Sequence, residues 1–510
     1  MKKRRILTPL LIALLAAPGC KDEFLETPDP NNLGASSLYV DADNANLALT
    51  GAYAPLKDID LWGDQIHFFL HQITDEYDLV WKGDAGWNEI KQFSVSSENA
   101  TLRSAWYGVA KMVLRSNDVI ENVEKMKVPE QITQQNKDYI LGQAYFIRAF
   151  AHFLGVTIWG QQPVGVDGSA PGFPVVTRTP VNREQMYVRR ASVNEVYAQV
   201  ISDLQTAEGL LPAAWTGNGL GRVTKGAATA YLGKVYLYQQ DWDRAAAKFE
   251  EVIGNPAYSL LPNYGDNFNG KAENSPESIF EVQFSDKSPV MSWDGGPGHA
   301  YATRHAPDPL GWGNVNLSPA TVSRFGSDPR LRHTAFIPGK DSVKIGESAN
   351  WQPYKNTNGT GYSPKKFIRT DRSAVNTGTV LFNNEINMPL MRLADVYLMY
   401  AEAQTEKGNA AGALEYVNKV RRRAYGLAPG TPSPAADLAV TGSAEVRQAI
   451  RDERFLELCG EGHRWFDLLR WGIADDLLTP RGFTPGIHEA MPIPTNEIQL
   501  NPAMTQNNGY

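Results

Sequence analysis

Cysteine is nearly absent from this chain of 510 residues, which contains only Cys20 and Cys459. A disulfide framework of the kind that holds small secreted domains is therefore excluded. The fold must be stabilised by a large buried apolar core. This length is typical of two or three domains or of one extended solenoid-like body.

Positive charge is also scarce, because 49 Lys and Arg stand against 56 Asp and Glu, for a formal net charge of -7. Phosphate binding needs concentrated Lys and Arg, so nucleic acid is excluded as the main partner. The sequence has no nucleophile elbow, no phosphate loop and no zinc-spaced set of Cys and His. We therefore expect no bound cofactor.

Metal ligands at a recognisable spacing are missing as well. His67 and His71 stand four residues apart on an apolar helical pattern, but no third ligand follows at a suitable spacing, which favours packing histidines. The acids Asp75, Glu76 and Asp78 lack the alternating acid, Asn and Gly pattern of a calcium loop. The sequence therefore predicts no metal site.

Long hydrophobic runs are limited to the N-terminus, where residues 6–17 follow four basic residues. This run is too short to span a bilayer comfortably, and it predicts a cleaved export signal over residues 1–19. The small residues before Cys20 resemble the lipobox of bacterial lipoproteins, with Ala17 where the box usually carries Leu. We expect Cys20 to be acylated and residues 20–34, rich in Pro, Asn and Asp, to form a tether.

Helical patterns dominate the rest of the chain. Long apolar periodicities, such as those over 141–154 and 193–210, alternate with loops rich in Gly, Pro and Asn. Strand signals, such as 278–284, are short and few. The expected fold class is mainly α, with long irregular loop excursions and a few short strands.

Two segments, 226–259 and 394–427, have the residue spacing of tetratricopeptide units, which are helix pairs of about 34 residues. In the first segment, Gly233 allows a close helix approach against which Phe249 packs. Gly408 provides the turn of the second. Such a helix-pair scaffold offers a surface to a protein partner and little intrinsic chemistry.

The C-terminal part contains a long block over residues 450–472, IRDERFLELCGEGHRWFDLLRWG. Three shorter blocks accompany it, at 277–282 (ESIFEV), 391–403 (MRLADVYLMYAEA) and 492–497 (PIPTNE). Together these blocks resemble the SusD/RagB family of outer-membrane nutrient-binding lipoproteins. With the lipoprotein-like start, the resemblance extends over nearly the whole chain.

The resemblance implies a SusD-like body over 35–510, with an N-terminal part of about 35–220 that contains an early ligand loop and a signature region of about 277–510. It also implies a protein that is not an enzyme. Such a protein is lipid-anchored at the cell surface, captures oligosaccharide and delivers it to a SusC-like TonB-dependent transporter. The charged residues 21–23 resemble the signal that sends lipoproteins to that surface.

An enzymatic alternative would use Glu453, Glu457 or Glu461 of the signature block as paired catalytic carboxylates, as glycosidases require. The same block contains the arginines Arg451, Arg454 and Arg464. Such neighbours hold carboxylates ionised, whereas a general acid needs a raised pKa. We therefore expect an ion-pair scaffold, with the i,i+3 pairs Glu461 with Arg464 and Asp467 with Arg470, and no catalytic residue.

A glycan site needs exposed aromatic rings flanked by carboxylates, amides or cations, because sugar rings have apolar faces and polar edges. Two loop regions offer this combination. The first contributes Asp75, Trp81, Lys82, Trp87, Asn88 and Phe93, and the second contributes Trp293, Tyr301 and Trp312. Packing is an equal alternative for Trp81, Trp87 and Trp293, and it is favoured for Trp312, which stands between two glycines.

Other functions remain open beside glycan capture. A RagB-like protein of the same fold would bind peptide, in a wider and more polar cleft with fewer paired tryptophans. A surface glycoside hydrolase would cleave the glycan, and a purely structural assembly subunit would bind no ligand. The tryptophan content of the loops favours glycan over peptide.

Replacement of Cys20 by alanine should release a folded protein from the membrane fraction, because an acyl chain supplies hydrophobic anchoring that the acidic body lacks. Fractionation of cells that express the variant measures this. The matched control is Cys459→Ala, which should stay with the membrane. Membrane retention of Cys20→Ala would contradict the lipoprotein prediction.

Overall fold

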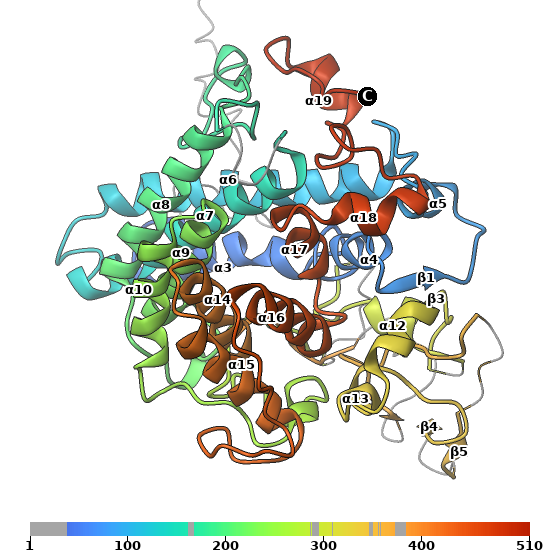
Figure 1. The fold of residues 1–510 in the computed structure, drawn as a ribbon. Coiled ribbons are helices and arrows are strands. Elements are labelled where there is room, and N and C mark those ends of the chain that lie inside the picture. The colour runs from blue at the N-terminus through green and yellow to red at the C-terminus, as the bar shows by residue number, and fades with distance from the viewer. Residues whose placement is uncertain are drawn as a thin grey trace, which may run out of the picture.

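The computed structural model describes residues 38–161, 168–285, 287, 295–308, 310–345, 350–354, 356, 359–372 and 384–510. About half of these residues lie in helices and only a few in short strands, so the expected fold class is confirmed (Figure 1). Within them, no helix is long and apolar enough to cross a membrane. The predicted export signal, Cys20 and the tether lie outside the described residues.

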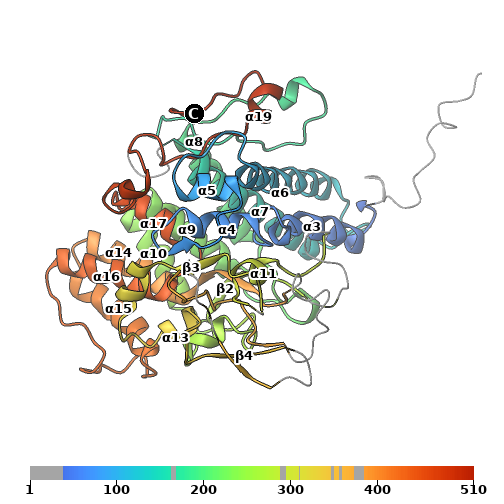
Figure 2. The same cartoon turned by 90° about the vertical axis from the view of Figure 1, so that its right-hand side faces the viewer.

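The longer helices form a continuous array. They are α3 Ala42–Lys57, α4 Gln65–Gln72, α5 Ala85–Lys91, α6 Ala100–Lys125, α7 Gln134–Trp159, α8 Val193–Leu210, α9 Lys225–Tyr238, α10 Trp242–Ile253, α14 Leu393–Glu406, α15 Ala410–Ala424, α16 Ser443–Leu458 and α17 Arg464–Arg470. From α6 to α10 each helix packs on the next, α10 packs on α14, and α14 and α15 pack on α16. Figure 2 shows α3, α6 and α7 side by side.

Short helices lie mainly in the second half of the chain. They are α11 Tyr301–His305, α12 Pro319–Phe325, α13 Leu331–Thr334, α18 Ala474–Leu478 and α19 Thr495–Leu500, with 3-10 turns at Glu184–Met186, Gly217–Gly219, Tyr264–Asn267 and Thr479–Arg481. The signature block forms α16 and α17. Gly460 and Gly462, both at φ +81°, separate these two helices, as the sequence indicates.

Capping side chains fix where the long helices begin. Asn99 before α6, Thr133 before α7 and Ser192 before α8 each accept a hydrogen bond from a backbone N–H three residues on. Glu195 completes a capping box with Ser192. The predicted apolar patterns lie in α7 and α8. Because α7 is buried on nearly every side from Ile140 onward, it forms the centre of the core.

The first predicted helix pair is α9 with α10. A Cβ atom added at Gly233 would lie 2.6 Å from Cε1 of Phe249, so the two helices approach as closely as the spacing predicts. The second pair is α14 with α15, and Gly408 in their turn has φ +88°. The packing of both pairs is confirmed. Their assignment to tetratricopeptide repeats, and the division of the body into parts, stay predictions.

The strands form three small sheets. β1 Tyr77–Leu79 pairs with β3 Val315–Leu317, β2 Ser278–Val282 pairs with β7 Met388–Arg392, and β4 Ser342–Ile345 lies between β5 Gln352–Pro353 and β6 Asp371–Arg372. The β1–β3 pair is antiparallel, with Tyr77 opposite Leu317 and Leu79 opposite Val315. This ladder joins the early part of the chain to the segment that runs from α11 to β6, which we call the mid-chain excursion.

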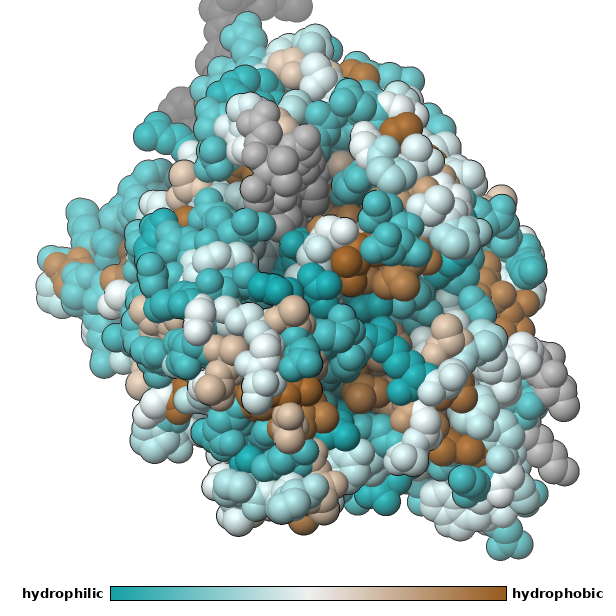
Figure 3. All heavy atoms as spheres, in the orientation of Figure 1, coloured by the Kyte–Doolittle hydropathy of each residue, from teal (hydrophilic) through white to brown (hydrophobic). Residues whose placement is uncertain are grey.

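Most large apolar side chains are buried in one continuous core that extends over the helical array. The face of the molecule shown in Figure 3 is mostly hydrophilic, and its apolar residues form small, separate groups. An exposed ring on such a surface is therefore informative when it lies in a cleft.

Replacement of Gly233 by leucine should lower the free energy of unfolding by about 1–3 kcal/mol, because the side chain overpacks the contact with Phe249. Chemical denaturation measures this loss. The matched control is Gly209→Leu, on α8, where an added Cβ meets no atom within 4 Å. The control should be neutral or more stable. Equal stability of the two variants would contradict the close packing of α9 on α10.

Candidate functional site

An open cleft with a volume of about 910 Å³ lies between α5, the start of α6 and the loop that joins α11 to β3. Its lining residues are Gln65, Trp81, Asp84, Gly86, Trp87, Glu89, Ser96, Glu98, Asn99, Ala100, Thr101, Ser104, Arg304, Asp308, Gly311, Trp312 and Asn314. Three tryptophans are combined with carboxylates, amides and hydroxyls. This mixture of apolar rings and converging polar groups is typical of a small-molecule site.

The two exposed tryptophans of the cleft lie at one end of the β1–β3 ladder. Beyond the paired strands, the backbone N–H groups of Val80 and Trp81 donate to the carbonyl oxygen of Asn314, at 2.8 and 3.2 Å. On the other strand, Trp312 precedes Asn314 by two residues, and its N–H donates to Thr303. The ladder thus brings Trp81, 49% exposed, and Trp312, 53% exposed, to the same cleft. The packing role favoured for Trp312 is therefore wrong.

Trp87 forms an inner wall of the cleft. The segment expected to be a loop contains the helix α5, which begins because Asp84 accepts a hydrogen bond from the N–H of Trp87. Trp87 is 5% exposed and packs on Phe68, while its edge meets the ring of Trp81 at a centroid distance of 5.4 Å. The guanidinium of Arg304 lies 4.6 Å from the centroid of the Trp87 ring.

Arg304 is held in this position by a buried carboxylate. Its Nε lies 2.6 and 2.7 Å from the two carboxylate oxygens of Asp64, which is fully buried. Burial raises the pKa of Asp64, although Arg304 opposes this shift. The pair therefore fixes the guanidinium over the indole and leaves it little freedom to move toward a ligand.

Three predicted polar residues have other roles. Asp75 accepts two hydrogen bonds from Arg464, at 2.8 and 2.7 Å, and does not line the cleft. Burial alone would raise the pKa of Asp75, but Arg464 outweighs it and the pKa is lowered. Asn88 donates to the backbone carbonyls of Lys82 and Asp84, and so stabilises the entry to α5. Lys82 is exposed but is not among the lining residues.

The expectation of exposed rings is wrong for two aromatic residues. Phe93 is 4% exposed and packs against Phe483 and Trp465. Tyr301 is fully buried at the start of α11, where its ring stacks on His305 at 4.0 Å. Both rings belong to the interior and cannot contact a ligand in the cleft. Trp293, the remaining predicted residue, lies outside the described residues.

Sequence reasoning missed most polar residues of the cleft, among them Gln65, Glu98, Arg304 and Asp308. They lie in segments without a recognisable motif. Helix capping gave a usable signal at Asp84 before α5 and at Asn99 before α6, because capping residues mark helix starts. Two helix starts therefore converge on the cleft.

The histidines His67 and His71 pack in the interior, as the sequence favours. The ring of His67 stacks on Tyr301 and that of His71 on Tyr77, at centroid distances of 4.4 and 4.6 Å. Burial lowers the pKa of His67 to about 3, so this ring is neutral at neutral pH. Within the part of the chain that the structure describes, no group of three or more His, Cys, Asp or Glu could hold a metal ion.

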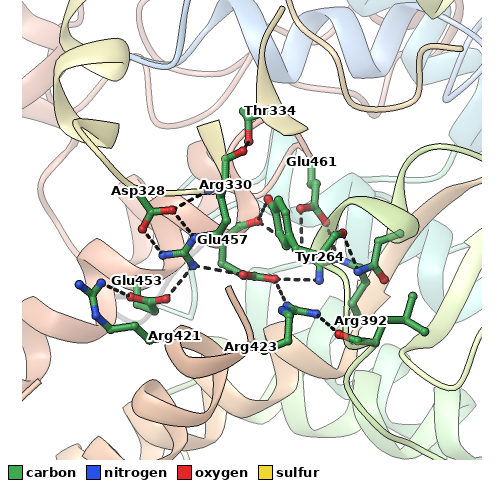
Figure 4. Close-up of polar contacts among 12 residues, drawn as sticks. Tyr264, Asp328, Arg330, Thr334, Arg392, Arg421, Arg423, Glu453, Glu457 and Glu461 are labelled. Carbon is green, nitrogen blue, oxygen red and sulfur yellow. Dashed lines mark hydrogen bonds and ion pairs between the residues drawn. The ribbon is translucent and has the colours of Figure 1, made fainter. Parts of the chain in front are cut away.

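The glutamates of the signature block are buried in a network of ion pairs (Figure 4). Glu457 contacts Arg330, Arg392 and Arg423, at 3.1, 3.0 and 2.5 Å. These arginines outweigh the effect of burial and lower the pKa of Glu457 to about 2. Glu461 pairs with Arg392 and Lys366, at 2.8 and 2.7 Å.

Glu453 differs from its neighbours, because burial raises the pKa of its carboxyl. It nevertheless pairs with Arg330 at 2.6 Å and with Arg421 at 3.4 Å. Glu453 is 1% exposed and does not line the cleft. The network therefore fits the predicted scaffold, and it gives these three carboxylates no access to a substrate in the cleft.

The partners of these glutamates differ from those expected. Arg454 pairs with Asp395 and Asp467, Arg464 pairs with Asp75, and Arg451 lies over the ring of Trp471. The predicted pair of Glu461 with Arg464 is therefore wrong, whereas the predicted pair of Asp467 with Arg470 is confirmed, at 2.9 Å. The glutamates pair instead with cations from other elements, among them Arg330, Arg392 and Arg423.

Two family models match separate parts of the chain. The model of the SusD family matches residues 276–510. A SusD-like model, whose description is starch-binding associating with outer membrane, matches residues 24–237. Together they cover most of the sequence.

Individual relatives align with nearly the full length. The chain is 28% identical to SusD-like protein P25 of Formosa agariphila, over 96% of both chains. It is 23% identical to the starch-binding protein SusD of Bacteroides thetaiotaomicron, over 86% of this chain and 84% of that protein. The solved structure of a laminarin binding SusD-like protein superimposes with a TM-score of 0.76 at 28% identity, and covers 92% of this chain and 100% of that chain.

Replacement of Glu457 by glutamine should lower the free energy of unfolding by about 3–5 kcal/mol, because it leaves buried arginines without their counter-charge. Because the pKa of Glu457 lies below its ordinary value of 4.5, its stabilisation is present above pH 4.5 and is lost as the pH falls toward 2. Denaturation at neutral and acidic pH measures both effects.

The matched control for Glu457→Gln is Asp452→Asn on the same helix. Asp452 pairs with Arg324 at the surface, so this change should cost less than about 1 kcal/mol. Equal losses in the two variants would contradict the central role of the buried network.

Proposed function

Because the chain belongs to the SusD/RagB family, we propose that it binds oligosaccharide in the cleft between Trp81 and Trp312. Binding occurs without cleavage of a bond. The protein is a lipoprotein anchored through Cys20 at the outer membrane, where it passes the glycan to a TonB-dependent transporter. The description of the matching SusD-like model, which associates that family with the outer membrane, supports this location.

The main support for this proposal is the pair of exposed indole rings in one cleft. The apolar face of a sugar ring stacks on an aromatic ring, while its hydroxyls need hydrogen-bond partners around the ring. Trp81 and Trp312 supply such rings in the cleft lining. Asn314 and Ser104 add an amide and a hydroxyl to the lining.

The relatives support a carbohydrate ligand for this chain. One relative carries starch in its name, and one solved neighbour is a laminarin binding protein. Both starch and laminarin are glucans. The peptide-binding alternative would favour a cleft with fewer paired tryptophans, and this cleft contains three.

The hydrolase alternative needs two carboxylates that are available to one glycosidic bond. Two carboxylates of the cleft have structural partners. Asp84 caps α5, and Glu89 accepts a hydrogen bond from Asn99 at 3.0 Å. The other two, Glu98 and Asp308, are exposed, so the carbohydrate-binding relatives, and not the lining alone, favour a protein that binds without cleavage.

Replacement of Trp81 or Trp312 by alanine should weaken binding of laminarin or soluble starch by about 2 kcal/mol, or about 30-fold, as expected for a central stacking residue. Both rings are half exposed, so the melting temperature should change little. Affinity electrophoresis and calorimetry measure the loss, and an assay for new reducing ends measures cleavage.

The matched control for these variants is Trp351→Ala, since Trp351 is 51% exposed and does not line the cleft. It should bind as tightly as the parent. Parental affinity in both Trp81→Ala and Trp312→Ala would place the site elsewhere. Release of reducing ends by the parent protein would favour the hydrolase.

A further inference from the structure

We propose that this cleft selects uncharged glycans and rejects glycans that carry sulfate or carboxylate groups, an inference that rests on the proposed function. The argument depends on the sign and the availability of the charges that line the cleft. Four carboxylates and one guanidinium are present among its described lining residues.

The carboxylates come from separate segments of the cleft lining. Asp84 and Glu89 come from the start and the middle of α5, and Glu98 precedes α6. Asp308 comes from the loop that leads to Trp312. Glu98 and Asp308 are exposed. An anionic group that enters the cleft would therefore meet negative charge from three segments of the lining.

Arg304 does not offset these charges. Both oxygens of the buried Asp64 lie within 2.7 Å of its Nε, so its positive charge is already paired within the protein. Its guanidinium covers the ring of Trp87. A site built to bind sulfate or carboxylate would instead direct the fork of an arginine at the ligand.

Neutral sugars suit the same lining, because every sugar hydroxyl can donate a hydrogen bond and a carboxylate accepts one. A sulfate or uronate group replaces this donor by an acceptor. Repulsion adds to the lost bond, since two like charges about 7 Å apart in water weaken binding by roughly threefold. Several carboxylates together should therefore discriminate by about tenfold or more at low ionic strength.

The test uses pairs of glycans that share a backbone and differ in charge. Calorimetry on the full-length protein, at low and high salt, compares the binding of laminarin with that of sulfated laminarin, and the binding of soluble starch with that of carboxymethyl starch. The measured quantity is the ratio of the neutral to the anionic affinity. We expect this ratio to be about ten or more for the backbone that binds, and to shrink in high salt.

Variants that neutralise charged residues test whether the cleft determines the ratio of neutral to anionic affinity. In the double variant Glu98→Gln with Asp308→Asn, the ratio should fall by at least about threefold. The control double variant is Asp243→Asn with Glu251→Gln on α10, which changes the net charge equally. α10 lies on the other side of the molecule from α5 (Figure 1), so the control should keep the parental ratio.

The outcomes separate the two proposals. An anionic glycan that binds as tightly as its neutral partner overturns the selectivity and leaves glycan binding intact. An equal fall of the ratio in both double variants also overturns it, because net charge and not the cleft would then be responsible. If neither neutral nor anionic glycans bind, the proposed function itself fails.

Discussion

The buried contacts of Glu457 with Arg330, Arg392 and Arg423 hold the distant parts of this fold together. These arginines come from the start of α13, the end of β7 and α15. A buried charge without its partner is strongly destabilising, so the network tolerates only one arrangement of these segments. It fixes the mid-chain excursion on the helical array. The mid-chain excursion also contains β3 and Trp312. The position of Trp312 in the cleft therefore depends on the ion-pair network, although the residues of the network do not line the cleft.

The sequence predicted the scaffold role of the signature block and its pair of Asp467 with Arg470, but not the partners of its glutamates. Its acids and arginines alternate along the chain, which suggested local partners such as Glu461 with Arg464. In the folded protein Arg464 reaches Asp75 and Glu461 reaches Arg392. The ion-pair partners in a buried network depend on which side chains lie close together in the interior. The spacing of residues along the sequence gives little information about this. Helix patterns were predictable because they depend on neighbours a few residues away, and the contact of Gly233 with Phe249 was predictable because it joins two consecutive helices of a known repeat spacing.

The candidate site was predicted in part for the same reason. The sequence located both loop regions, and Trp81 and Trp312 lie together in the cleft. It could not tell an exposed ring from a buried one. The short helix α5 brings Trp87 to the inner wall, and α11 places Tyr301 in the interior. Both helices are too short to give a clear periodic signal, and exposure in such segments depends on tertiary packing.

The β1–β3 ladder draws its two strands from opposite halves of the chain. Contacts between residues so far apart in sequence are slow to form, because the intervening chain must lose much of its freedom before they are made. A chain that ends before Trp312 therefore has only one of the two indole platforms, on a strand without its partner. The sugar-binding site therefore forms late in the folding of this protein. Binding of a glycan indicates that the whole chain has reached its native topology.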